Sequence, residues 1–167
     1  MAEREVILEH PNRSKAGVKL TRVIVIVILL ASVVLMGIVL VGGWDALAGQ
    51  KPALVAYMLI YLLLAVFAAR WNRGVLPVGA SLGIVLAIFA AVAGSSWYDR
   101  HRHGFTEPSI HSNVLGTLCY VLIPVQVLLI VFASRGFSQD WHVEVERHAD
   151  GSLDEEPDYG EPAPSAV

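Results

Sequence analysis

The sequence has 167 residues, of which 55% are hydrophobic and 16% are charged, and its mean hydropathy is +0.59. Because an average soluble domain carries about 25% charged residues, this composition argues against an ordinary soluble protein and favours an integral membrane protein. The formal net charge of −3 averages unlike segments and by itself excludes no class of partner.

Four stretches without a charged side chain predict four transmembrane helices, at residues 23–41, 53–69, 75–93 and 114–133. At about 1.5 Å per residue, such helices come close to the roughly 30 Å thickness of the hydrocarbon core. The first stretch is longer than the apolar core of a signal peptide, about 7–15 residues, so we interpret it as an uncleaved anchor. We therefore expect an all-α membrane protein.

The charged residues lie outside these stretches and define the remaining segments. Residues 1–22 form a basic N-terminal segment, residues 23–134 the transmembrane domain, and residues 42–52 and 94–113 its two outer loops. From Gly136 onward there are nine acidic residues and one basic residue. We expect the tail, residues 135–167, to be largely disordered. Within it, the alternation of Val143 to Glu146 is typical of a short strand, which would need a partner strand.

Lysine and arginine are distributed unevenly between the two sides of the predicted spans. Counting only those close to the spans, the N-terminal side has seven and the other side has three: Arg13, Lys15, Lys19, Arg22, Arg70, Arg73 and Arg135 against Lys51, Arg100 and Arg102. The positive-inside rule then places both termini in the cytoplasm and the spans in the cell (plasma) membrane. All four tryptophans lie near span ends, as expected of an aromatic belt: Trp44, Trp71, Trp97 and Trp141.

Small side chains recur at every fourth position of the third span, at Gly79, Gly83, Ala87 and Ala91. This spacing predicts a ridge that another helix can approach closely. We therefore expect two antiparallel hairpins with the third helix at the centre of the packing. Gln126 is the most polar residue within a span, and we interpret it as an interhelical hydrogen-bonding group whose partner is Tyr57, Tyr61 or Ser81.

The predicted spans contain no Asp, Glu, Lys, Arg or His. Proton-coupled transporters depend on ionisable groups within the membrane, and membrane-bound haem needs axial ligands there, so both classes are disfavoured. The chain also lacks a phosphate-binding loop, a nucleophile elbow and a basic nucleic-acid-binding face. We expect a protein that is not an enzyme, needs no cofactor and binds no nucleic acid.

The second outer loop contains the candidate metal ligands of the chain: Asp99, His101, His103, Glu107 and His111. Such side chains suit Zn²⁺ or Cu²⁺, and histidines titrate near pH 6.5. However, their spacing matches no closed zinc motif, and Arg100 and Arg102 would repel a cation. We therefore predict no metal site, while a pH or metal response of this loop stays an alternative.

Arg135-Gly136-Phe137, followed by the run from Trp141 to Glu146, resembles the end of small four-span proteins from high-GC Gram-positive bacteria. The resemblance covers mainly the fourth span and its exit, and it implies no known activity. Three functions stay open: an accessory or scaffold subunit, a sensor acting through the outer loop, and an oligomeric channel or transporter for a neutral solute. The expected partners are the lipid bilayer and either another membrane protein or further copies of this chain.

Overall fold

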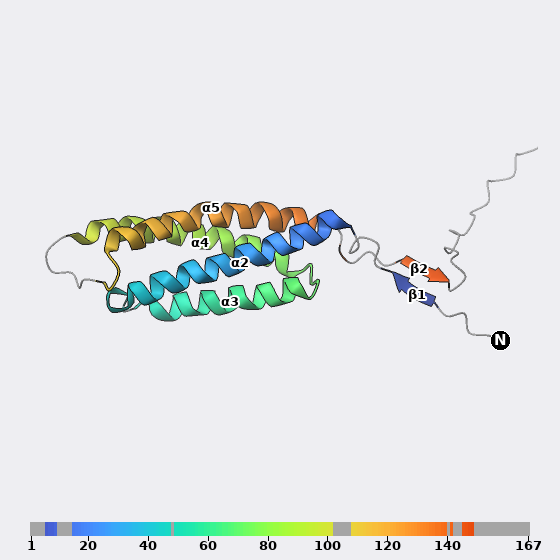
Figure 1. Cartoon of the computed structure of the whole chain (residues 1–167), viewed down its shortest axis with the longest axis horizontal. Helices are drawn as coiled ribbons and strands as arrows, with labels where there is room; N and C mark the ends of the chain where they lie inside the picture. The colour runs from blue at the N-terminus through green and yellow to red at the C-terminus, as the bar shows by residue number, and fades with distance from the viewer. Residues whose placement is uncertain are drawn as a thin grey trace, which may run out of the picture.

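The computed structural model describes residues 6–9, 15–47, 49–101, 108–139, 141 and 145–148. Four long helices lie side by side along one axis (Figure 1): α2 (Ala16–Gly42), α3 (Lys51–Ala69), α4 (Val75–Tyr98) and α5 (Ser112–Phe137). Each of them is long and apolar enough to cross a membrane. The predicted all-α architecture with four membrane-spanning helices is therefore confirmed, and the chain is a multi-pass membrane protein.

The helices form two hairpins, α2 with α3 and α4 with α5, and α5 also packs against α2. The contact between α2 and α5 therefore joins the two hairpins, and the expectation that the third helix is the packing centre is wrong. Helices α3 and α4 make little contact with each other. The four buried residues of α3, which run from Tyr61 to Ala68, all lie in its second half. Its first half is consequently only partly covered by the other helices, with Leu54, Tyr57 and Met58 half-buried against the core.

Each helix except α3 extends several residues beyond the span predicted for it, and α3 gains two residues at its start. The predicted spans end at the glycine, proline or polar residues that border the charge-free runs, but a helix can continue past such residues into the headgroup layer. In α4, for example, the hydroxyls of Ser95 and Ser96 donate to the carbonyls of Ala91 and Val92, at 3.1 and 3.0 Å. These bonds let polar side chains continue a helix at the membrane boundary.

The turn between α3 and α4 places Trp71 in the left-handed region, with φ = 62°. Its amide donates to Ala68 O and the next amide, of Asn72, donates to Phe67 O, both at 3.1 Å. This is the hydrogen-bond pattern of a Schellman motif, in which glycine is the usual residue at that position. Tryptophan there costs on the order of 1–3 kcal/mol. The contacts of its indole ring, described below, offset that cost.

Two glycines bring α4 and α5 together at the end opposite this turn. A Cβ atom at Gly94 would lie 3.1 Å from the ring of Tyr120, and one at Gly116 would lie 2.9 Å from the ring of Tyr98. The two tyrosine rings stack, with centroids 5.9 Å apart. A tyrosine of each helix therefore packs over a glycine of the other helix.

A short antiparallel ladder lies beyond the helices, between β1 (Val6–Glu9) and β2 (Val145–His148) (Figure 1). The register pairs Val6 with His148 and Glu9 with Val145. The strand signal seen at Val143 to Glu146 therefore overlaps β2, and its partner strand comes from the N-terminal segment of the same chain. Of the tail predicted to be largely disordered, residues 135–167, residues 135–137 belong to α5 and residues 145–148 to β2. Residues 140, 142–144 and 149–167 lie outside the described residues.

Substituting Gly116 by Ala should destabilise the protein by about 1–3 kcal/mol, because the new methyl group overpacks the α4–α5 contact. Tyr98 alone could move aside, but the Gly94 carbonyl oxygen, which would lie 3.2 Å from the new Cβ atom, belongs to the backbone. Gly17→Ala is the control, since nothing lies within 4 Å of a Cβ there. Thermal unfolding in detergent measures the stability of both variants. An unchanged Tm for Gly116→Ala would contradict the close approach of α4 and α5.

Candidate functional site

A fully buried group of three polar side chains, which we call the polar node, joins three of the four helices. It consists of Ser32 of α2, Tyr61 of α3 and Gln126 of α5, each with 0% of its surface exposed. The Tyr61 hydroxyl donates to Oε1 of Gln126 at 2.9 Å, and Nε2 of Gln126 donates to Oγ of Ser32 at 2.9 Å. The Ser32 hydroxyl donates in turn to the Ile28 carbonyl at 2.8 Å.

This chain of bonds brings Gln126 to Tyr61, one of the three partners considered from the sequence. Ser81, another of them, instead donates to the carbonyl of Pro77. Ser32 was missed by the sequence reasoning, although it is the only hydroxyl-bearing residue in the apolar run 23–41. Because unpaired polar groups are costly in hydrocarbon, a lone serine in such a run is a signal for a partner on a neighbouring helix.

The small-residue ridge of α4 is fully buried only in its first half. Gly79 and Gly83 are buried, whereas Ala87 and Ala91 are half-buried. A Cβ atom at Gly83 would lie 3.5 Å from Oε1 of Gln126, so this glycine brings α4 against the polar node. Beyond Gly83 the buried side of α4 continues through other residues: Leu86, Ala90, Gly94 and Trp97.

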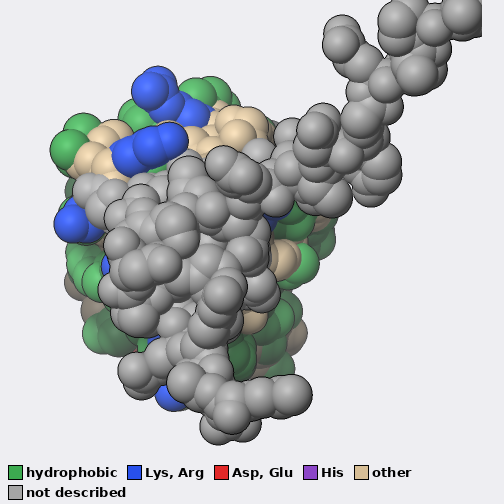
Figure 2. Space-filling model, turned by 90° about the vertical axis from the view of Figure 1, so that its right-hand side faces the viewer, with side chains coloured by type: hydrophobic (Ala, Val, Ile, Leu, Met, Phe, Trp, Pro, Cys, Tyr) green, Lys and Arg blue, Asp and Glu red, His purple; other side chains and the backbone are tan. Residues whose placement is uncertain are grey.

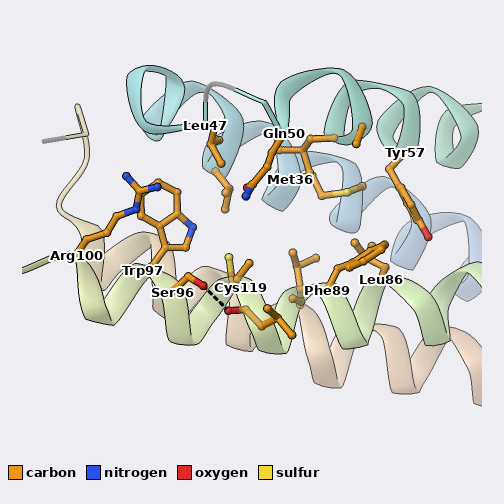
Figure 3. Close-up of a pocket in the computed structure, with 17 residues that line it drawn as sticks. Met36, Leu47, Gln50, Tyr57, Leu86, Phe89, Ser96, Trp97, Arg100 and Cys119 are labelled. Carbon is orange, nitrogen blue, oxygen red and sulfur yellow. Dashed lines mark hydrogen bonds between the residues drawn. The ribbon is translucent and has the colours of Figure 1, made fainter. Parts of the chain in front are cut away.

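A cavity of about 370 Å³ lies between the first half of α3 and the second half of α4, which we call the lateral cavity. Figure 3 shows side chains of the α3 segment, such as Gln50 and Tyr57, on one side and those of α4, such as Phe89 and Ser96, on the other. Side chains of α2 and α5 also line it. Phe89, on the α4 side, is 58% exposed, so the cavity is open laterally toward the medium around the bundle.

One end of the lateral cavity carries most of its polar side chains, including Gln50, Ser96, Trp97 and Arg100 (Figure 3). The Arg100 guanidinium lies 4.6 Å from the centroid of the Trp97 ring and donates to the Ala46 carbonyl at 3.1 Å. Cys119, a free and buried cysteine, also lines the cavity. Among the described residues the rest of the lining is apolar except for Tyr57, which lies toward the other end (Figure 3), so most of the polar side chains gather at the Arg100 end.

We call the end of the bundle where α2 begins and α5 ends the basic end. It carries most of the described lysines and arginines: Lys15, Lys19, Arg22, Arg70, Arg73 and Arg135. Several of them are visible in Figure 2, around atoms of the undescribed segments. At the opposite end the described ones are Lys51 and Arg100. The two ends of the folded bundle therefore differ in their number of lysines and arginines. This is the difference from which the sequence predicts that the termini are cytoplasmic.

The tryptophans do not form the expected belt facing the headgroup layer. Trp44 is half exposed, but Trp97 is 3% and Trp141 0% exposed within the protein. The rings of Trp141 and Trp71 meet edge to face, with centroids 5.6 Å apart, and the Arg22 guanidinium lies 4.2 Å from the Trp71 centroid. These three residues close the basic end through aromatic and cation–π contacts.

Of the candidate metal ligands, only Asp99 and His111 have described side chains, and both are exposed. His111 caps α5, because its Nδ1 accepts from the Asn113 amide at 3.3 Å. The His101 side chain, His103 and Glu107 lie outside the described side chains. Within the described part of the chain, no group of three or more His, Cys, Asp or Glu residues could hold a metal ion.

The fold and these sites define the class of the protein, a four-helix multi-pass membrane protein with a closed polar interior and a laterally open cavity. Comparison with known protein families, curated proteins and solved structures finds no match. The resemblance to four-span proteins of high-GC Gram-positive bacteria therefore stays a prediction.

Replacing Gln126 by Leu should destabilise the protein, because it removes both hydrogen bonds of the glutamine and leaves the Tyr61 hydroxyl without its acceptor. We expect the free energy of unfolding to fall by at least about 0.6 kcal/mol, the average for such bonds in membranes. The upper bound is about 3 kcal/mol, the cost of an unpaired buried group. Thermal unfolding in detergent tests this, with Ser81→Ala as an exposed control. The double variant with Tyr61→Phe should lose less than the two single losses combined, whereas full additivity would contradict a shared bond.

Proposed function

We propose that this chain is a non-enzymatic accessory or scaffold subunit of a membrane complex, acting through the outward faces of its helices. The observation that supports this best is the nature of its buried polar side chains. Within the described residues none of the buried side chains is Asp, Glu, Lys, Arg or His, and the buried polar ones are Thr21, Ser32, Tyr61, Ser112 and Gln126. Proton and ion pathways rely on ionisable groups in the membrane interior, so the described interior favours a structural role.

The function of a channel or transporter for a neutral solute is less well supported. It would use Tyr57, Tyr61 and Gln126 to line a path, but Tyr61 and Gln126 are fully buried and bonded to each other. A solute that used them would have to break that bond in a medium with no replacement partner. The sensor function depends on the outer loop, most of whose histidines lie outside the described side chains, and it stays an alternative.

The surface that we assign to a partner is the outward face of α3, the helix least covered by the rest of the bundle. Leu59 and Leu63, one helical turn apart, are each 56% exposed. Large apolar side chains on such a face can pack against another membrane helix as well as against lipid. The acidic tail, largely outside the described residues, would add a contact surface for a basic partner on the same side as the termini.

Purification from native membranes in mild detergent, followed by mass determination, should yield a complex with another membrane protein or a homo-oligomer. Leu59→Ala with Leu63→Ala should weaken this complex, because it removes the anchoring side chains, and should leave the Tm nearly unchanged. The matched control is Val127→Ala with Leu128→Ala on α5, which are 51% and 49% exposed. A monodisperse single chain that retains no partner would contradict the accessory role.

A further inference from the structure

The lateral cavity opens toward the medium that surrounds the helices, and at this depth that medium is lipid. Its rim includes two strongly exposed side chains of α4, Phe89 at 58% and Val92 at 63%. Its volume of about 370 Å³ is more than twice that of an apolar cavity of roughly 150 Å³ that takes one benzene molecule. Because the cavity is open laterally, a molecule of the surrounding lipid can enter it from the side.

The length of the cavity matches the depth of one bilayer leaflet. On α4 its lining runs from Leu86, at the middle of the helix, to Arg100, just past its end. At about 1.5 Å per residue this distance is roughly 21 Å. Half of a bilayer, headgroups included, is also about 20–22 Å thick. An occupant that fills the cavity would therefore reach from the membrane midplane to the headgroup layer.

The polarity of the lining changes along the same direction. Its deep part is formed by residues such as Met36, Leu86 and Leu122, and its polar end by Gln50, Ser96 and Arg100. Among the described residues that line the cavity, Arg100 is the one with a charged side chain; Asp45 and Asp99 belong to the same end of the bundle, but neither is among them. The described lining therefore presents a guanidinium to an occupant. A guanidinium has five N–H donors in a geometry that suits phosphate oxygens.

We propose that the lateral cavity is a binding site for one anionic phospholipid, with an acyl chain along the apolar part and its phosphate at Arg100. A lipid is favoured over other occupants because the opening adjoins the bilayer, the length equals that of a leaflet and the polar end carries a cation. The cation–π contact with Trp97 and the bond to the Ala46 carbonyl hold the guanidinium at the cavity mouth. This inference does not depend on the proposed accessory role.

Native mass spectrometry of the full chain in mild detergent tests the site, with equimolar phosphatidylglycerol and phosphatidylcholine of equal chain length as probes. The wild type should retain one lipid and prefer phosphatidylglycerol by about ten-fold. Both lipids offer a phosphate to Arg100, but phosphatidylcholine also carries a choline cation, which offsets the attraction to the guanidinium. Ala53→Phe places a ring in the cavity and should lower lipid retention by a similar factor. Ala56→Phe is the matched control, because Ala56 is also exposed on α3 but does not line the cavity.

The headgroup position is tested separately from the chain position. Arg100→Gln should remove the preference for phosphatidylglycerol and still retain lipid, whereas Lys51→Gln, at the same end but outside the lining, should keep the preference. Ala93→Phe fills the cavity from α4 and replaces Ala53→Phe if that variant fails to fold. The proposal is overturned if Ala53→Phe and Ala93→Phe retain as much lipid as the wild type, or if the wild type retains both lipids equally. It is also overturned if the wild type is a lipid-free dimer that dissociates when either phenylalanine is introduced.

Discussion

Hydrocarbon offers no hydrogen-bonding partner to a polar side chain, and this constraint explains most of the architecture of the helix bundle. Every polar side chain that enters the bundle must find a partner inside the protein. The polar node meets this requirement by linking Ser32, Gln126 and Tyr61 into a chain that ends on the Ile28 carbonyl. Since the three side chains come from α2, α5 and α3, the bonds fix the relative position of these helices. Gly83 then allows α4 to approach the same point.

The packing of α4 is asymmetric, and this asymmetry produces the cavity. On one side it contacts α5 closely, where tyrosine rings cover Gly94 and Gly116. On the other side it meets α3 mainly near the basic end, where Leu64 faces Gly79. The first half of α3 has no buried residue and therefore stands apart from α4. The closed half of the bundle stabilises the fold, and the open half offers a binding surface.

Much of the fold follows from the sequence, because charge-free runs and helix length are local properties. The predicted ridge of Gly79, Gly83, Ala87 and Ala91 agrees with the buried stripe of α4 only at its two glycines. Strict four-residue steps rotate by roughly 40° per step around a helix of 3.6 residues per turn, so the later positions leave the buried face. The observed stripe alternates steps of three and four residues and so stays on one face through Leu86 and Ala90. The Gln126 bond could be foreseen from its polarity. The cavity could not, because it depends on the distance between two helices.

The central claim is that four helices cross the bilayer, so that the turn after α2 and the end of α5 lie on opposite sides. Single cysteines at Gly49 and Ser138, both exposed, in a Cys119→Ser background test it directly. In intact cells a membrane-impermeant thiol reagent should label Gly49→Cys and should label Ser138→Cys only after permeabilisation. Equal labelling of both positions in intact cells would contradict the account.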